Sequence, residues 1–420
     1  MVEVAFRTRQ HMSEIEAKKA INLFGRGNPY GHVNWSGTNP FLPVVYGALF
    51  LLMIFITSCK KEKTTDTAFS PTPYDLTIPK YFPTQLNIPP DNPMTVEGVT
   101  LGRYLFYDGR ISGRDHPDSL MSCATCHLQS RSFECGIDHP KYTGGHPFGI
   151  TGILTPHYMV PLINLVWINN GYLWNGSVYE ENVNPNMRNL EDFTWMAILS
   201  SHEMNSDTDR TKALIQQTKG YPDLFKKAFG SETVTIKNMG RAIAQFLRTL
   251  VSSDSKFDCY LRGEVQLNQN ELRGYVLFMT EQGADCFHCH GGEGNPLFTT
   301  SLFYNNGKDS LFTDPRDRFS VTNNPGDIGA YKAPTLRNLV FTAPYMHDGR
   351  FKTLDEVLDF YNTKLIWSPS ISTLMHHIGN HGICLTPPEL SDLKTFLLTL
   401  TDSTFITNPA YSRPLKFPDE

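Results

Sequence analysis

The stretch that decides the fold is CATCH, residues 123 to 127. The same pattern, CxxCH, occurs a second time as CFHCH, residues 286 to 290. In such a CxxCH motif the two thiols can add across the vinyl groups of a haem, and the adjacent histidine can bind its iron. The alternative is a zinc site split between two CxxC pairs. Here the pairs lie far apart, and each is followed at once by histidine. The sequence therefore predicts two covalently bound haem c groups. Their predicted attachment residues are Cys123, Cys126, His127, Cys286, Cys289 and His290.

The composition is that of an ordinary globular protein. The chain has 420 residues, a formal net charge of -5 and charges of both signs interspersed along it. These features indicate neither a basic face for nucleic acid nor an acidic disordered tract. The length suffices for two domains of ordinary size. One domain for each haem is the natural division.

The residues before the first motif indicate export. An apolar run, PVVYGALFLLMIFITS at residues 43–58, leads into Cys59 and then into three lysines within four residues. Its length fits a signal peptide better than a membrane span. The end of the run resembles a bacterial lipobox, whose cysteine is lipidated. We therefore expect a periplasmic lipoprotein held to a membrane at Cys59. The alternatives are a plain membrane anchor or a cleaved signal with a bystander cysteine, and the polar residues 1–39 make the start codon doubtful.

Helical periodicity surrounds each motif, and strand patterns are almost absent. The predicted helices lie at residues 101–108, 192–199, 209–229, 236–250, 271–279, 354–361 and 386–400. A polar joint, residues 252–270, separates the two groups. We expect a mainly α protein of two cytochrome c-like haem domains. The predicted order is a signal region at 1–59, a tether at 60–94, an N-terminal haem domain at 95–255, a C-terminal haem domain at 265–401 and a tail at 402–420.

Several further segments resemble one family. They are LGRYLFYDGRISG (101–113), VPLINL (160–165), LWNGS (173–177), SSHEM (200–204), GADCFHCHGG (283–292) and APTLRNLVFTAPYMHDGRFKTLDEVLDFYN (333–362). Over about residues 101–400 the sequence resembles the bacterial di-haem cytochrome c peroxidases, which include the MauG enzyme. The resemblance implies a peroxidatic haem in the N-terminal domain and a six-coordinate relay haem in the C-terminal domain. It also implies hydrogen peroxide as substrate and a small cytochrome c or cupredoxin as electron donor.

The resemblance assigns roles to three residues near the first haem. Glu203 matches the family's distal glutamate, which acts as acid and base during peroxide cleavage; the alternative is a solvated glutamate at a helix end. Trp174 matches the tryptophan that lies between the haems and is thought to couple them, and is otherwise a core aromatic residue. His146 resembles the histidine that caps the peroxidatic haem in the resting oxidised enzyme. His139 and His157, in the same loop, compete with it.

Two positions depart from the family pattern. The glutamine that usually shares the distal pocket falls on Phe193, unless the longer insert at residues 182–189 shifts the register. The asparagine that helps to bind an interdomain calcium ion is replaced by Met159, although Thr342 and Pro344 keep the segment whose carbonyls contribute. The sequence therefore leaves one Ca²⁺ ion as an open prediction.

The distal ligand of the second haem is the most informative position. In the peroxidases of the family it is a methionine, whereas MauG uses a tyrosine, and the same place here holds Tyr361. A phenolate stabilises ferric iron and lowers the reduction potential, and a thioether raises it. Met346 and Met375 are competing ligands. We expect His347 to hold the turn beside the relay haem.

Three functions remain open at this point. The first is a peroxidase that reduces hydrogen peroxide to water with electrons relayed through the second haem. The second is a MauG-like oxidase that removes electrons from a protein side chain, which Tyr361 favours. The third is a non-catalytic electron carrier with both irons six-coordinate, against which Glu203 argues.

Overall fold

The computed structural model describes residues 69–143, 146–177, 189–292 and 294–420, and these belong to one compact unit, Thr67–Glu420. The expected mainly α class is confirmed. In the described ranges, the strands are two-residue segments that form antiparallel pairs: β1 (Tyr142–Thr143) with β2 (His146–Pro147), and β3 (Phe303–Tyr304) with β4 (Tyr331–Lys332). The predicted signal and lipidation site lie outside the described residues.

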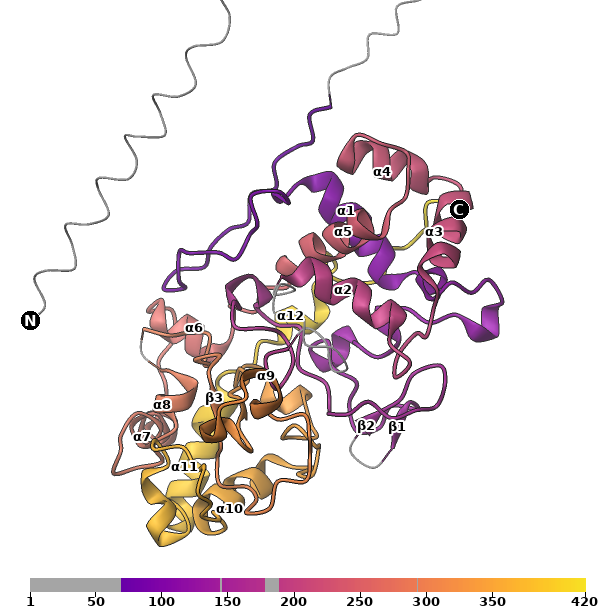
Figure 1. The fold of residues 1–420 in the computed structure, drawn as a ribbon. Coiled ribbons are helices and arrows are strands. Elements are labelled where there is room, and N and C mark those ends of the chain that lie inside the picture. The colour runs from indigo at the N-terminus through magenta and orange to yellow at the C-terminus, as the bar shows by residue number, and fades with distance from the viewer. Residues whose placement is uncertain (1–68, 144–145, 178–188, 293) are drawn as a thin grey trace, which may run out of the picture. The chain divides into compact units, whose positions relative to one another are not determined.

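One group of helices packs around the first motif (Figure 1). It comprises α1 (Val96–Tyr107), α2 (Leu190–Leu199), α3 (Thr208–Gln217), α4 (Tyr221–Phe229) and α5 (Ile236–Arg248). Gly220, with a φ of 86°, divides the predicted stretch 209–229 into α3 and α4. Gly102 lets α1 lie close to α5, because a side chain there would collide with the carbonyl of Ala242.

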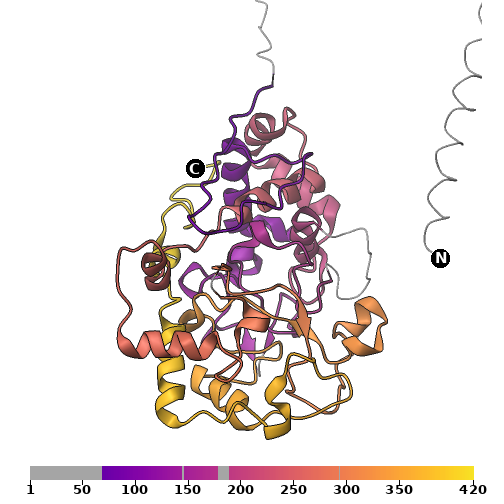
Figure 2. The ribbon, with the colours of Figure 1, turned by 90° about the vertical axis from the view of Figure 1, so that its left-hand side faces the viewer.

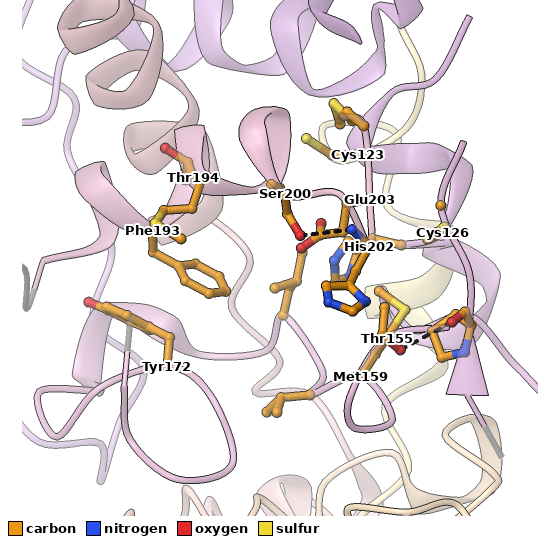
Figure 3. Close-up of a pocket in the computed structure, with 18 of the residues that line it drawn as sticks. Cys123, Cys126, Thr155, Met159, Tyr172, Phe193, Thr194, Ser200, His202 and Glu203 are labelled. Carbon is orange, nitrogen blue, oxygen red and sulfur yellow. Dashed lines mark hydrogen bonds between the residues drawn. The ribbon is translucent and has the colours of Figure 1, made fainter. Parts of the chain in front are cut away.

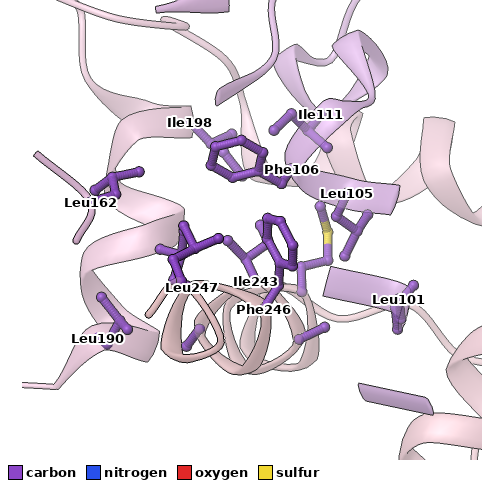
Figure 4. Close-up of a cluster of buried hydrophobic side chains, with 14 of the residues drawn as sticks. Leu101, Leu105, Phe106, Ile111, Leu162, Leu190, Ile198, Ile243, Phe246 and Leu247 are labelled. Atoms are coloured by element: carbon purple, nitrogen blue, oxygen red, sulfur yellow. The ribbon is translucent and has the colours of Figure 1, made fainter. Parts of the chain in front are cut away.

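The apolar faces of these helices form one continuous core (Figure 4). Leu105 and Phe106 of α1 meet Ile243 and Phe246 of α5, and all four side chains are almost fully buried. The sequence pattern predicts both buried faces, since Ile243, Phe246 and Leu247 are spaced i, i+3, i+4 along α5, and Leu101 lies one turn before Leu105 and Phe106 on α1. The core side chains leave room beside the first CxxCH motif for a large apolar group.

A second group of helices surrounds the second motif, and Figure 2 shows the same grouping from another side. It comprises α6 (Lys256–Leu261), α7 (Gln269–Phe278), α8 (Phe287–His290), α9 (Phe319–Thr322), α10 (Leu354–Thr363) and α11 (Pro387–Leu398). The expected polar joint is folded in part, since it contains α6. Phe257 of α6 is fully buried in a second core with Phe278, Phe298 and Phe396.

Both ends of the described unit pack against other parts of it. The predicted tail contains α12 (Ser403–Thr407), and Phe405 is buried against Phe133 with ring centroids 5.6 Å apart. Near the other end, Phe82 packs on Trp167 at 5.2 Å, and the indole Nε1 donates to the carbonyl of Pro83 at 2.7 Å. Of the helices that the structure describes, none combines the length and apolarity needed to cross a membrane.

Two candidate haem cavities

The first motif lines a cavity of about 330 Å³ whose other walls are largely apolar (Figure 3). Cys123 opens a short 3-10 turn, Cys123–Thr125, which places His127 at the cavity. The Nδ1 atom of His127 lies 2.7 Å from the carbonyl oxygen of Phe133. When Nδ1–H donates to that oxygen, Nε2 is left for a metal. Burial lowers the pKa of His127 to about 4, which keeps the imidazole neutral and fit to bind iron.

The second motif lines a separate cavity of about 210 Å³ with the same local design. The Nδ1 atom of His290 lies 3.0 Å from the carbonyl oxygen of Pro334, so Nε2 again remains for iron. Burial lowers the pKa of His290 to about 4 as well. Each cavity therefore combines two thiols, one neutral and oriented imidazole, and an apolar lining. This donor set fits a covalently attached haem.

Glu203 lies in the first cavity. It follows α2 in a tight turn in which its backbone N–H donates to the carbonyl of Ser200 at 3.0 Å. Glu203 and Cys123 line the same cavity, where burial raises the pKa of the Cys123 thiol and the negative charge of Glu203 raises it further. Figure 3 shows Glu203 beside Cys123 and Cys126. The structure thus brings the predicted proton-transfer residue and the first motif together.

The rest of the first cavity agrees only partly with the expectations. Phe193 lines it and stacks on Tyr172 at 5.5 Å, so the place expected for glutamine is apolar. His146 does not line it. Its buried Nδ1 has no hydrogen-bond partner among the described residues, and burial lowers the pKa of the ring. The competing His157 does line the cavity, but its Nε2 lies 2.6 Å from a carboxylate oxygen of Asp314.

A wall of shared residues separates the two cavities. Tyr158, Met159, Pro161 and Trp174 line both of them. The buried indole of Trp174 is fixed because Nε1 donates to the carbonyl of Tyr158 at 2.7 Å. The Trp174 carbonyl accepts from the N–H of Lys332, also at 2.7 Å. An aromatic side chain therefore lies between the two candidate haem sites.

Sequence reasoning missed a polar cluster behind this wall. The imidazole of His347 stacks on the ring of Tyr331 with centroids 3.5 Å apart, and the ring centroid of Trp174 lies 6.3 Å from that of the same imidazole. The Tyr331 hydroxyl donates to Asp314 at 2.9 Å, and that carboxylate also binds His157. His347 is thus part of a packed cluster beside the second cavity. Asp314 and Tyr331 come from a loop without a recognisable motif, so the sequence contained no signal for them.

Two of the candidate ligands for the second haem, Tyr361 and Met346, contact the side-chain amide of Asn306. The hydroxyl of Tyr361 accepts a hydrogen bond of 2.9 Å from Nδ2 of Asn306, and the same Nδ2 lies 3.8 Å from Sδ of Met346. Met375 lines this cavity too. Burial raises the pKa of Tyr361, and the hydrogen bond from Asn306 opposes that rise. The structure brings all three predicted candidates together and adds Asn306, which the sequence did not indicate.

A mainly α fold with two such cavities defines a di-haem c-type protein. The sequence matches the family described as di-haem cytochrome c peroxidase over residues 96–266. It is 31% identical over 348 residues to cytochrome-c peroxidase IdrP1 of Pseudomonas sp. (strain SCT), covering 75% of this chain and 84% of that protein. It is 32% identical over 314 residues to the methylamine utilization protein MauG of Methylorubrum extorquens, covering 74% and 80%.

A solved structure agrees. A MauG-like protein associated with microbial copper homeostasis is 33% identical, with a TM-score of 0.69, over 82% of this chain and 100% of the other. The chain belongs to the di-haem cytochrome c peroxidase family.

Proposed function

We propose that the protein reduces hydrogen peroxide to water in the first cavity, with electrons that enter through the second. The observation that carries this proposal is the carboxylate of Glu203, which lies in the same cavity as Cys123 and His127. Relatives named cytochrome-c peroxidase support the reaction class. In this proposal residues 95–255 form the peroxidatic haem domain and residues 265–401 form the electron-transfer haem domain.

The chemistry divides between the cofactor and the chain. A haem bound through His127 would supply the iron redox chemistry. Glu203 would accept a proton from one peroxide oxygen and return it to the leaving oxygen, so that two protons and two electrons convert one H2O2 into two waters. A small cytochrome c or cupredoxin would deliver the electrons to the haem bound through His290. Trp174, in the shared wall, would lie on the path between the two haems.

For the second iron we propose Tyr361 as the distal ligand. Its hydroxyl lies in the second cavity and accepts a hydrogen bond from Asn306, which favours the phenolate form. A tyrosine there also favours the second candidate function, peroxide-driven oxidation of a side chain on a partner protein, as do the relatives named MauG. A peroxide-dependent modification of a co-expressed partner, detected by mass spectrometry, would distinguish that function from simple peroxide reduction.

For the first iron we propose His146 as the resting distal ligand. His146 does not line the first cavity in this structure, so its loop would have to move for the imidazole to reach the iron. The unpartnered Nδ1 and the pKa lowered by burial suit a neutral imidazole ligand. The loop that carries His146 is hydrogen-bonded to Glu203, since the backbone N–H of Ile150 donates to the carbonyl of Glu203 at 2.8 Å. Loss of a low-spin EPR signal of the oxidised protein in His146→Ala would support the assignment. An unchanged spectrum would contradict it.

We also propose one calcium ion between the cavities. The side chain of Met159 carries no oxygen, and Ca²⁺ requires oxygen ligands. The carboxyl of Glu134, however, is buried in the cavity that Thr342 and Pro344 line, and its Oε2 has no hydrogen-bond partner among the described residues. Burial raises its pKa well above the usual value, and a cation there would reverse that shift. Calcium content after dialysis should be about one per chain and should fall in Glu134→Gln.

We propose a periplasmic protein anchored by lipid at Cys59. The apolar run before Cys59 and the covalent haem motifs support export. Mass spectrometry of the mature N-terminus should find a diacylated cysteine at this position. An unprocessed or unmodified Cys59 would contradict the anchor without affecting the catalytic proposal.

The decisive experiment for the catalytic proposal combines turnover with EPR. The holoprotein, supplied with a reduced small cytochrome c, should consume hydrogen peroxide and oxidise two cytochromes for each peroxide. After reductive activation, EPR should show one iron with an open distal position. No turnover together with two six-coordinate low-spin irons would establish the electron carrier instead.

A further inference from the structure

A separate group of metal-binding side chains lies at the second haem motif. Glu281, His288 and His376 each offer one ligand atom, and these atoms all lie within 4.8 Å of one another. We propose that these three residues bind a divalent transition-metal ion, with Zn²⁺ and Cu²⁺ best matched to two imidazoles and a carboxylate. This site goes beyond the proposed function, which uses none of the three residues.

A buried carboxylate orients both imidazoles. Asp285, whose side chain is 4% exposed, places Oδ1 2.5 Å from Nδ1 of His288 and Oδ2 2.9 Å from Nδ1 of His376. Metal-bound histidines commonly donate their other ring N–H to a carboxylate, which fixes the tautomer and the ring orientation. Here one carboxylate does so for two histidines. The Nε2 atom of each ring is then the one left for a metal.

The third candidate ligand, Glu281, lies near the ring nitrogen of His288 that does not contact Asp285. Oε1 of Glu281 lies 3.6 Å from Nε2 of His288. The two imidazole rings are nearly perpendicular, at 89°, with centroids 5.2 Å apart. Glu281 and His376 are exposed, so that an ion can reach the site from solvent. Three protein ligands would leave a fourth position for water.

The alternative explanation is a set of ion pairs in which protonated histidines bind the two carboxylates. It accounts for the contacts of His288, which has a carboxylate near each ring nitrogen. It requires no specific ion, however, and it predicts that neither histidine affects metal affinity. The two explanations therefore differ in a measurable quantity.

The position of the site suggests what the ion would do. His288 lies between the attachment cysteines Cys286 and Cys289, and His376 follows Met375 and lines the second cavity. A bound ion would link the haem-attachment segment to the segment that carries Met375. Its positive charge beside the haem would favour the reduced state, so the reduction potential of that haem should rise.

The test is equilibrium dialysis of the holoprotein against Zn²⁺, with metal and haem measured in the same sample. We expect about one Zn²⁺ for each chain. His288→Gln and His376→Gln should each abolish specific binding, and Asp285→Asn should weaken it about 10- to 100-fold. His377→Gln is the matched control, because His377 binds the backbone carbonyl of Glu281 at 2.8 Å but lies outside the ligand set.

A second measurement guards against variants that fold poorly. Glu281→Gln changes an exposed residue, and it should retain two haems while losing most of its Zn²⁺ affinity. In the wild type, Zn²⁺ should raise the potential of the second haem, and in Glu281→Gln it should not. Absence of Zn²⁺ binding by the wild type, or equal binding by all four variants of the site, would overturn the proposal. Peroxide turnover of the metal-free protein tests the proposed function independently.

Discussion

The two haem cavities share their attachment chemistry and differ in the groups that complete them. In both, the histidine of the CxxCH motif, His127 or His290, has its Nδ1 beside a backbone carbonyl and a pKa lowered by burial. The first cavity contains Glu203, a group that can move protons. The second contains Tyr361 and Met346, groups that can bind iron, gathered around one amide.

This difference shows where function resides in such a protein. The CxxCH motif specifies that a haem is attached, but it is the same in both halves and so cannot assign their roles. The roles depend on side chains contributed from elsewhere in the chain. Each prediction below removes one feature that the cavities share or one that separates them.

The largest effect should follow from removing a shared feature. Cys123→Ala with Cys126→Ala should leave one haem per chain, because both thioether bonds of the first cavity are lost. Pyridine haemochrome absorbance, normalised to protein, should fall by half, and peroxide turnover should disappear. Cys384→Ala, at an exposed free cysteine, is the control and should keep both haems. Two haems in the double variant would show that the first cavity holds its cofactor in another way.

The next largest effect should come from Glu203, the group that distinguishes the first cavity. Glu203→Gln keeps the size of the side chain but removes its ability to accept a proton. Peroxide turnover should fall by about a hundredfold to ten-thousandfold with haem content unchanged. Glu232→Gln, at an exposed glutamate paired with Lys226, should leave turnover unaffected. Full activity of Glu203→Gln would mean that another group moves the proton.

A smaller effect should follow from displacing Glu203 without replacing it. A side chain at Gly149 would collide with the carbonyl of Glu203, so Gly149→Ala must move either its own loop or the backbone of Glu203. Displacement of a catalytic group by about 1 Å can cost about a hundredfold in rate. Gly326→Ala is the control, since its new methyl group would meet nothing nearer than 3.5 Å. Equal turnover in the two variants would show that the carboxylate adapts to the shift.

Much of the fold was predictable because its causes are local. Periodic apolar residues and clear capping signals, such as Thr386 with Glu389, locate α11 to within two residues of the predicted ends. Helix α6 was not predicted, although it has local signals: Ser255 and Asp258 form a capping box at its start, and Phe257, Cys259, Tyr260 and Leu261 are apolar. Phe257 is buried there by contacts from distant segments, and Asp258 pairs with Arg337, 79 residues away. Only the pairing of Asp258 with Arg337 lies beyond any short window of sequence.

The candidate sites divide in the same way. The candidates in continuous motifs are the CxxCH residues, Glu203 and Tyr361. They could be proposed from the sequence, and each of them lines one of the two cavities. Asn306 could not be proposed, because its contact with Tyr361 spans 55 residues and its surroundings carry no pattern. The pairing of Asp285 with His376 spans 91 residues and was missed for the same reason. Interactions that join loops become visible only in three dimensions.

The second cavity is tested by Tyr361→Phe. If the phenolate binds the iron, its loss removes an anionic ligand that favours the ferric state, so the potential of the second haem should rise. The low-spin EPR signal of that haem should also change, and the first haem should not. A methionine-to-iron charge-transfer band in the oxidised wild type, or an unaltered spectrum in the variant, would instead indicate Met346 or Met375.

The smallest predicted effect is that of Asn306→Leu, which should shift the potential of the second haem only if Tyr361 is the ligand. A hydrogen bond to a bound phenolate withdraws electron density from it, so removing the donor should strengthen the ligand and lower the potential of the second haem. A hydrogen bond of about 1 kcal/mol corresponds to a shift of about 40 mV for a one-electron couple. The Asn306 variant should therefore shift the potential downward while Tyr361→Phe shifts it upward. In the double variant the Asn306 substitution should have no further effect, because its partner is gone.

If Met346 is the ligand, its distant contact with Asn306 at 3.8 Å predicts almost no shift in the single variant. Redox titration monitored by visible absorbance measures all three variants in the same way.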